Sequence, residues 1–524
     1  MGLKVFKNFY QDPALFWLGI TFLVWWSGIG GRDLYLLPAL IFFLIYIYKI
    51  WKNKPLNIPI DLKISFYWKK LLIILFLLHV VLFLAITFFK YYSFSWNVWD
   101  VGNFSNKLYN ISQGSFYSSY LGAHDWADHF NPSMSPLAFL YFLVPSANWV
   151  TLAKTIAYVS VPLIIYQICK ECFDNKDKAW FVTVILALAW MLIYAPAVNS
   201  FFFEFQPSSL APPFILYAFL CFKRENWLIF WLLMFFLLGF KEHLGAVWIG
   251  FGFYMVLATP KKKMGFLLIA GGAIALYVII FKVMPFFRNY QDSWSMVIGP
   301  LQDIPKKIVY LFKILIPFGF IPLIFWRFGI IAGPAIGVNL LSGAGRSQMY
   351  STGYHYDDVS STLLMIAMVL SFSKLSMENV NHFKKKKLIW GISVFWFACL
   401  ISLLPSSPLR ILYAAIPNNS HWEIRQELIK FDKLSKDDSI AVQTSLGPKF
   451  NRTNISAITQ DRNGECAPMR RQQLMTDTKY LVFAKSLNHY LIDDLDECIR
   501  TIRMSSGYRQ LHGFSHLEIF VKSK

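Results

Sequence analysis

Residues 96–136 form a polar segment between long apolar runs of the sequence. The segment begins WNVWDVGNF and ends GAHDWADHFNPSMSP. Polar groups beside a lipid bilayer are costly unless they serve a purpose, so this segment is the first place to look for chemistry. Its ionisable side chains include three acids and two histidines, namely Asp100, Asp125, Asp128, His124 and His129.

Asp100 closes the sequence WNVWD, just after an apolar run. Trp96 and Trp99 can anchor in the membrane interface, and a carboxylate flanked by them is well placed to accept a proton or hold a cation. The alternative is a solvated aspartate that caps a helix beginning near Val101.

The neighbours Asp128 and His129 can act as an acid and a base or as metal ligands, because an imidazole near a carboxylate titrates near neutrality. The alternative is an ordinary hydrogen-bonded turn before Pro132. His124 and Asp125 form a second pair of this kind, for which a functional role is less strongly indicated.

Two further sites place charged side chains in apolar surroundings. Glu204 stands among phenylalanines in FFFEFQPSSLAPP, where a carboxylate is either raised in pKa or paired with a partner. Lys241, Glu242 and His243 interrupt an apolar stretch, which suggests a paired site facing a polar cavity. The alternative for Glu204 is a residue at the level of the lipid headgroups whose side chain reaches water. The alternative for Lys241, Glu242 and His243 is a tight loop between two helices.

A last cluster lies in GAGRSQMYSTGYHYDD. Arg346 suits two-pronged binding of a phosphate or carboxylate, and Tyr354 and His355 suit stacking and hydrogen bonding to a sugar. The alternative is a belt of aromatic side chains at the membrane interface.

The sequence has no Walker A motif, no GxSxG elbow and no HExxH helix, so ATP hydrolysis, serine hydrolysis and zincin-type proteolysis have no support.

The composition indicates which elements must position these side chains. The chain of 524 residues is 56% hydrophobic and 15% charged, whereas soluble domains carry about 25% charged residues. Apolar runs of ~17–25 residues are typical of membrane-spanning helices, and roughly 13 runs are long enough to be considered. They lie near residues 14–30, 34–50, 70–89, 148–169, 179–196, 207–222, 228–241, 244–258, 265–282, 308–326, 328–342, 358–372 and 389–404.

The net charge of +20 comes largely from short basic connections between these runs. That pattern is typical of cytoplasmic loops in membrane proteins, and it argues against nucleic acid as a partner. If the basic connections are cytoplasmic, the N-terminus lies inside and the tail from about residue 405 lies outside. All the candidate clusters then lie on the outer face. The basic connections are 52–70, 170–178, 222–227, 259–264 and 374–387.

The sequence therefore predicts a mainly α fold, a polytopic transmembrane bundle of about 11–13 helices over residues 1–405 with a large first outer loop near 91–147. The tail, residues 418–524, alternates helical and strand-like patterns and is expected to be a small extracytoplasmic α/β domain. Cys466 and Cys498 lie in this tail. If the tail lies in an oxidising compartment, the two cysteines can form a disulfide, and the sequence is equally compatible with two free thiols.

The ordered motifs WDVGNFSNKLYNISQG, GAHDWADHFNPSMSPL, FFFEFQPSSLAPP, GFKEHLG and STGYHYDD resemble the bacterial membrane proteins grouped as domain of unknown function 2079. This family is placed in the GT-C superfamily of polytopic glycosyltransferases. The motifs cover roughly residues 95–360. In the family the Lys-Glu pair is commonly followed by an acid, where this chain has His243, which puts a carboxylate role there in doubt.

The resemblance implies that an acid in the first large outer loop acts as base or orients the acceptor, and Asp100 matches that position. The donor would be a sugar on a polyprenyl phosphate at the outer surface of a bacterial inner membrane. Lys241 and Arg346 would clamp the phosphate, and Asp100 or Asp128 would be the base. Some GT-C enzymes use a divalent cation, for which Asp100, Asp128 and Glu204 offer oxygen ligands, although no metal is expected here.

The leading hypothesis is an inverting glycosyltransferase that moves a sugar from this donor to a glycan, lipid or protein acceptor. Catalytic roles are expected for Asp100, Asp128 and His129, and substrate-binding roles for Glu204, Lys241, Glu242, His243, Arg346, Tyr354 and His355. The alternative is a transporter or flippase of a lipid-linked or anionic solute. Charges near the outer surface favour transfer, and charges midway across the membrane favour transport.

Overall fold

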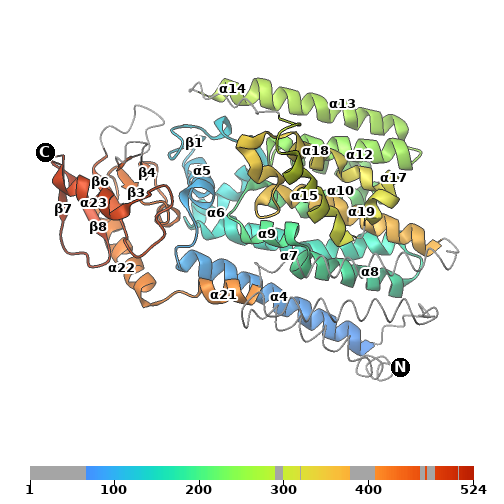
Figure 1. Cartoon of the computed structure of the whole chain (residues 1–524), viewed down its shortest axis with the longest axis horizontal. Helices are drawn as coiled ribbons and strands as arrows, with labels where there is room; N and C mark the ends of the chain where they lie inside the picture. The colour runs from blue at the N-terminus through green and yellow to red at the C-terminus, as the bar shows by residue number, and fades with distance from the viewer. Residues whose placement is uncertain are drawn as a thin grey trace.

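The computed structural model describes residues 66–288, 299–318, 320–377, 408–460, 466–468, 478–505 and 507–523. These residues form a mostly helical body joined to a smaller part that contains a β-sheet (Figure 1). The apolar runs expected near residues 14–30, 34–50 and 389–404 lie outside the described residues.

Three helices of the described chain are long and apolar enough to cross a membrane. They are Ile73–Tyr92 within α4 (Phe66–Tyr92), α7 (Asn148–Cys172), and Lys262–Phe287, which joins α13 (Lys262–Val278) to α14 (Met284–Phe287) through a π-helical turn. A fourth span results if α8 (Lys176–Leu188), the turn after it and α9 (Ala195–Phe202) are taken as one helix bent by 47°. The chain is thus a membrane protein with several apolar helices.

Several other apolar helices of the described chain are shorter than a bilayer is thick. The 12 residues of α11 (Trp227–Leu238) extend about 18 Å, whereas a hydrocarbon core is about 30 Å thick. The run expected near 308–326 is likewise divided between α15 (Ile304–Leu315), a 3₁₀ turn and α16 (Ile321–Ile324). Further helices of this body are α10 (Ala211–Lys223), α12 (Gly245–Ala258), α17 (Trp326–Gly329), α18 (Gly333–Leu341), α19 (Asp358–Met377) and α21 (Pro408–Ala415).

The end of α11 is covered by another segment of the chain, the 3₁₀ turn Pro132–Leu137 and α6 (Ala138–Leu143). Ser133 donates a backbone hydrogen bond to the carbonyl of Gly239 (2.8 Å) and a hydroxyl hydrogen bond to that of Phe236 (2.6 Å). Both segments expose apolar side chains, Phe139 and Phe142 on α6 and Leu228, Leu232 and Phe235 on α11.

Helices α12 and α13 pack with their backbones close together. A Cβ atom at Gly272 would lie 2.7 Å from the carbonyl oxygen of Gly245, and one at Gly265 would lie 2.7 Å from that of Gly252. Only glycine allows this approach, which is a common way for helices to associate in membranes. The contact fixes α13 against the rest of the body.

The C-terminal sheet unit, residues 419–523, contains α22 (Asn419–Leu434), α23 (Leu495–Met504) and a six-stranded sheet in the order β5-β4-β3-β6-β8-β7. Strand β3 is parallel to both β4 and β6, and the other pairs are antiparallel. The strands are β3 (Ile440–Val442), β4 (Ile455–Gln460), β5 (Cys466–Pro468), β6 (Tyr480–Phe483), β7 (Tyr508–Leu511) and β8 (Glu518–Lys522).

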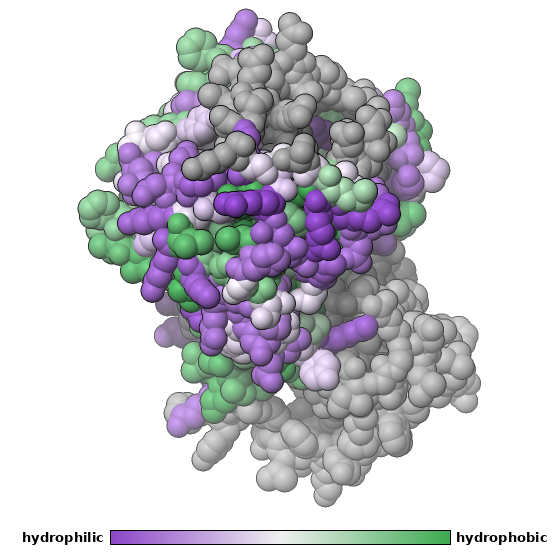
Figure 2. Space-filling view, turned by 90° about the vertical axis from the view of Figure 1, so that its left-hand side faces the viewer, coloured by the Kyte–Doolittle hydropathy of each residue, from purple (hydrophilic) through white to green (hydrophobic). Residues whose placement is uncertain are grey.

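Alternate residues of the strands face opposite layers, as the two-residue period of a strand requires. Tyr480 and Val482 of β6 pack on the α22 side, whereas Leu481 and Phe483 pack on the α23 side. Figure 2 views the molecule from the end at which this unit lies, and the coloured surface there is mostly hydrophilic with smaller hydrophobic areas.

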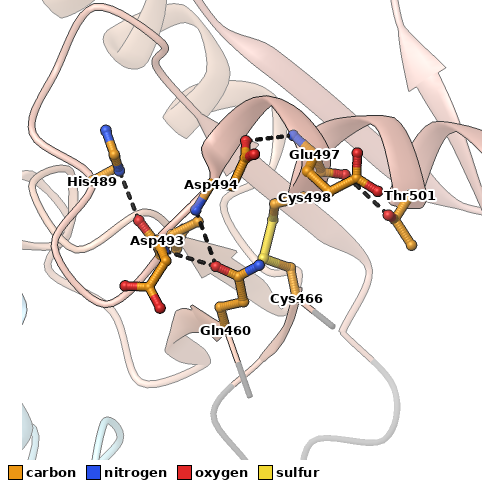
Figure 3. The surroundings of a disulfide bond; sticks show 9 residues. Gln460, Cys466, His489, Asp493, Asp494, Glu497, Cys498 and Thr501 are labelled. Carbon is orange, nitrogen blue, oxygen red and sulfur yellow. Dashed lines mark hydrogen bonds between the residues drawn. A yellow bond between two sulfur atoms is a disulfide. The ribbon is translucent and has the colours of Figure 1, made fainter. Parts of the chain in front are cut away.

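Cys466 and Cys498 form a disulfide that ties the start of β5 to α23, with their Cα atoms 5.4 Å apart (Figure 3). Beside it, the side chain of Gln460 accepts hydrogen bonds from the backbone N–H groups of Asp493 (2.7 Å) and Asp494 (3.1 Å). Of the two options that the sequence left open for these cysteines, the structure has the bonded pair.

Candidate functional site

Asp100 lies on a π-helical turn, Val98–Gly102, that connects the end of α4 to α5 (Asn103–Ser112). Single π-helical turns are rare and are frequently found at functional sites. The carboxylate of Asp100 is half-buried and accepts a hydrogen bond from the side-chain amide of Gln206, 106 residues further along the chain. Asp100 is therefore not a freely solvated helix cap.

Gln206 joins Asp100 to Lys241. Its amide nitrogen donates to Asp100, and its oxygen accepts a hydrogen bond of 2.9 Å from the Lys241 ammonium. The ammonium lies 3.2 Å from the Nε2 atom of His355, which accepts from it. Lys241, Gln206 and His355 are all buried, at 3%, 4% and 4% exposure. Three segments far apart in the sequence thus converge on one lysine.

His129 lies between two carboxylates. Its Nδ1 atom is 3.0 Å from Glu242 Oε1, and its Nε2 atom is 3.8 Å from Asp128 Oδ2. All three side chains are largely buried. The arrangement allows the imidazole to hold or pass a proton between the two acids.

The charges of this cluster shift one another's proton affinities. Burial raises the pKa of Asp100 to about 8, and the nearby carboxylate of Glu204 adds to the increase. Burial lowers the pKa of Lys241, although Glu242 and Asp100 oppose the decrease. Burial also disfavours the charge on Glu242, but the neighbouring His129 outweighs it and holds the pKa of Glu242 well below its usual range. Glu242 is therefore ionised at neutral pH, while the carboxyl of Asp100 is mostly protonated there and loses its proton near pH 8.

Glu204 is held by the loop before Asp100. Its carboxylate accepts hydrogen bonds from the backbone N–H (3.1 Å) and the side-chain amide (2.8 Å) of Asn97. The backbone of its own loop is held by Lys154 of α7, whose ammonium donates to the carbonyls of Ser200 (2.9 Å), Phe203 (2.8 Å) and Glu204 (3.0 Å). Glu204 thus holds the loop before Asp100 through its two hydrogen bonds with Asn97.

A cavity of about 210 Å³ lies beside Lys241. Its apolar lining residues are Leu276 of α13, Ile280 of the π turn after it, Val338 and Leu341 of α18, and Met349. Its polar lining residues include His129, Lys241, Glu242, His243, Arg346 and Tyr356. An amphiphilic molecule with an anionic head fits such a lining.

Five of the ten expected site residues line this cavity, and the other five do not. Of these five, His355 contacts Lys241 directly, and Asp100 is linked to Lys241 through Gln206. Asp128 contacts His129. Tyr354 is 40% exposed, and its ring lies 5.5 Å from that of Phe203. Sequence reasoning missed Gln206 and Lys154; the signal for Lys154 was a lone lysine inside an apolar run.

The pair His124–Asp125 has structural contacts instead. The carboxylate of Asp125 forms an ion pair of 3.1 Å with Lys107, and both side chains are 1% exposed or less. The ring of His124 stacks on Phe287 of α14 at 4.0 Å. These contacts hold the polar segment together and leave neither residue facing the cavity.

The residues that the structure describes contain no group of three or more histidine, cysteine or acidic side chains that could hold a metal ion. Asp100, Asp128 and Glu204, the acids considered as oxygen ligands, do not converge in this way. Within the described part of the chain these acids therefore do not form a cation site of three such ligands.

Apolar helices with a buried cluster of ionisable side chains at one end define a membrane protein with a polar site. The chain belongs to the family of predicted membrane proteins that share domain of unknown function 2079, whose model matches residues 90–489. The match includes every site residue from Asp100 to His355. No curated protein matches the chain.

Proposed function

We propose that the protein is a membrane glycosyltransferase of the GT-C type, which transfers a sugar from a polyprenyl-phosphate donor to a glycan, lipid or protein acceptor. The observation that carries the proposal is the mixed lining of the cavity, which contains aliphatic side chains together with Lys241 and Arg346. A prenyl chain with a phosphate at its end has the same division into apolar and anionic parts.

The donor can reach this cavity from the lipid. The wall helix α13 exposes Ile274 (62%) and Tyr277 (55%), and Phe281 of the π turn after it is 58% exposed. The buried ammonium of Lys241 is the natural partner of the phosphate, because charge-assisted hydrogen bonds are stronger in surroundings that exclude water. Arg346 adds a second cation to the lining of the cavity.

Asp100 is the base in this proposal. An acceptor hydroxyl attacks the anomeric carbon of the sugar, its proton passes to Asp100, and the polyprenyl phosphate leaves with the bonding electrons beside Lys241. A pKa of about 8 suits this task, because a base is most effective near the working pH. Gln206 couples the two ends of the reaction, since it contacts both Asp100 and Lys241.

The depth of the site favours transfer over transport. Lys154, which contacts the Glu204 loop, lies about 9 Å from the start of the 25-residue helix α7. The cluster is therefore near one end of the long helices, as expected for a reaction at a membrane surface. One observation favours the rival, a transporter of a lipid-linked or anionic solute: the ammonium of Lys154 is buried although it belongs to a helix long enough to span the membrane.

We place the site on the outer face of a bacterial inner membrane, with the C-terminal sheet unit outside the cytoplasm. Ion pairs link the basic connections at the opposite ends of the helices, Arg224 to Glu171 (2.8 Å) and Lys261 to Glu225 (2.9 Å). Basic connections are typical of the cytoplasmic side, and the disulfide of the sheet unit is typical of an oxidising compartment.

The test uses the full chain in lipid nanodiscs with a panel of farnesyl-phosphate-linked hexoses, and water serves as the acceptor, so that each turnover releases one free hexose and one farnesyl phosphate. We expect release of farnesyl phosphate from at least one hexose, a reduction of at least 100-fold in Asp100→Asn, and no change in Asp437→Asn on the surface of the sheet unit. The same probe is then enclosed in liposomes. Movement of intact probe across the membrane without farnesyl phosphate release would establish the transporter instead.

A further inference from the structure

The π-helical turn that carries Asp100 is covered by a turn of the C-terminal sheet unit, Gly447–Lys449. A Cβ atom at Gly447 would collide with Cγ2 of Val98 and would lie 3.4 Å from its Cβ. The hydroxyl of Tyr120 donates to the carbonyl of Gly447 at 3.2 Å. The two turns are thus in direct van der Waals contact, and only glycine fits at this point.

Lys449 anchors the same turn to the end of α4. Its ammonium donates to the backbone carbonyl of Tyr91 and lies over the rings of Tyr91 (3.2 Å) and Phe94 (4.6 Å). The last carbonyls of a helix have no partner within the helix, and a lysine there is favourable both for the hydrogen bond and for the helix dipole. The cation–π contacts add to the attraction.

The contact extends over a shared apolar core. Phe94, Val98 and Tyr120 pack in one cluster with Leu446 and Phe450 of the sheet unit. Phe94 lies before the Asp100 turn and Val98 is the first residue of that turn, so an apolar core of the sheet unit continues into the segment that carries Asp100. At its edge, the side-chain amides of Asn106 and Asn451 donate across the boundary, to the carbonyls of Arg452 (2.9 Å) and Pro145 (3.1 Å).

We infer that the Gly447–Lys449 turn is a positioning element for Asp100: docking of the sheet unit holds Val98–Gly102 in the conformation that directs the carboxylate to Gln206. The protein is then active when the sheet unit is docked on the Asp100 turn, and the sheet unit is part of the functional site. The role of Asp100 in transfer rests on the proposed function, whereas the effect of docking on the Asp100 carboxyl does not.

The contact is tested with the double variant Val98→Cys/Gly447→Cys in the full chain. The Cβ–Cβ separation of 3.4 Å is close to the range of about 3.5–4.5 Å found in disulfides. We expect nearly complete cross-linking with copper phenanthroline in nanodiscs, none in either single variant, and farnesyl phosphate release by the cross-linked protein within about twofold of its reduced form. Absence of the cross-link, or loss of release on cross-linking, would overturn the inference.

The positioning effect is tested with Gly447→Ala, which inserts a methyl group against Val98. The readout is modification of Asp100 by dicyclohexylcarbodiimide, which reacts with protonated buried carboxyl groups, measured by peptide mass spectrometry across pH 5–9. We expect the midpoint for Asp100 to fall by at least one pH unit. The matched control Gly507→Ala has nothing within 4 Å of the added atom and should leave the midpoint unchanged.

Adding Val98→Ala to Gly447→Ala removes the methyl group that causes the collision and should restore the wild-type midpoint. An unchanged midpoint in a folded Gly447→Ala protein would refute the positioning role, and the cross-linking result decides the matter if that variant does not fold. Failure of the proposed function has a different signature: no hexose probe releases farnesyl phosphate, while the cross-link and the carbodiimide profile behave as described.

Discussion

Replacement of Lys241 by methionine is the sharpest test of the cavity's role. Methionine keeps an unbranched side chain of similar length but removes the ammonium that contacts Gln206 and His355. Lys241 is 3% exposed and lies on the cavity wall, so water replaces it poorly. A phosphate bound there would lose one charge-assisted hydrogen bond.

The magnitude follows from that single bond. Hydrogen bonds to charged groups contribute about 1.5–3 kcal/mol, and each 1.4 kcal/mol corresponds to about a tenfold change in affinity. We therefore expect Lys241→Met to weaken binding of farnesyl phosphate by about 10- to 150-fold. Farnesol has no phosphate, so its weaker binding should change by less than about threefold.

The assay is calorimetric titration of both ligands into the full chain in nanodiscs. The control is Lys262→Met, which removes an exposed lysine at the first residue of α13. Binding of farnesyl phosphate within twofold of wild type in Lys241→Met would refute the phosphate site. An equal loss for farnesol would show that the substitution deforms the cavity instead of removing a charge contact.

Three other predictions follow from the structure. Burial raises the pKa of Asp100 from 3.8 to about 8, so between these pH values the folded chain binds more protons than the unfolded chain. Scanning fluorimetry should therefore show that the stability falls as the pH rises from 5 to 8, and that it falls less steeply in Asp100→Asn. Lys107→Met leaves Asp125 buried without its cation and should cost about 3–5 kcal/mol in denaturation experiments, and adding Asp125→Asn should restore part of this. Replacing Cys466 and Cys498, whose sequence separation is 32, with serine should lower the stability of the sheet unit by about 3–4 kcal/mol, measured by proteolysis of the full chain.

The sequence pattern predicted that the main polar residues lie on one side of the membrane. His129 and Glu242 are 113 residues apart, yet both fell on the same side of the membrane when the basic connections were placed on the other, and they are in contact. The pair Lys241–Glu242 stood out because charges inside an apolar run need partners. The partner Gln206 was not predicted, since a neutral amide two residues after Glu204 carries no sign of burial.

The limits of the sequence pattern are clearest in the sheet unit and in the short helices. The sequence pattern predicts helices in HWEIRQELIKFDKL and YLIDDLDECIRTIRMS, which overlap α22 and α23. It predicts strands in DSIAVQTSL, TKYLVFAKS and LEIFVKSK, which overlap β3, β6 and β8. Strands β4, β5 and β7 were not expected, because Cys466–Pro468 is too short to show a period and Tyr508–Leu511 is only partly buried. The apolar run that contains α11 indicates a full crossing, since hydropathy alone does not reveal where a helix stops.

That early stop changes what the surrounding lipid encounters. The last carbonyl groups of a short helix have no partner within the helix, and acyl chains cannot satisfy them; here Ser133, 103 residues before Phe236, supplies the donors. Phe139 and Phe142 of α6 add exposed apolar side chains beside the end of α11. The lipids around the protein then meet an apolar surface assembled from two distant stretches of chain, so the short length of α11 does not force the bilayer to thin around it.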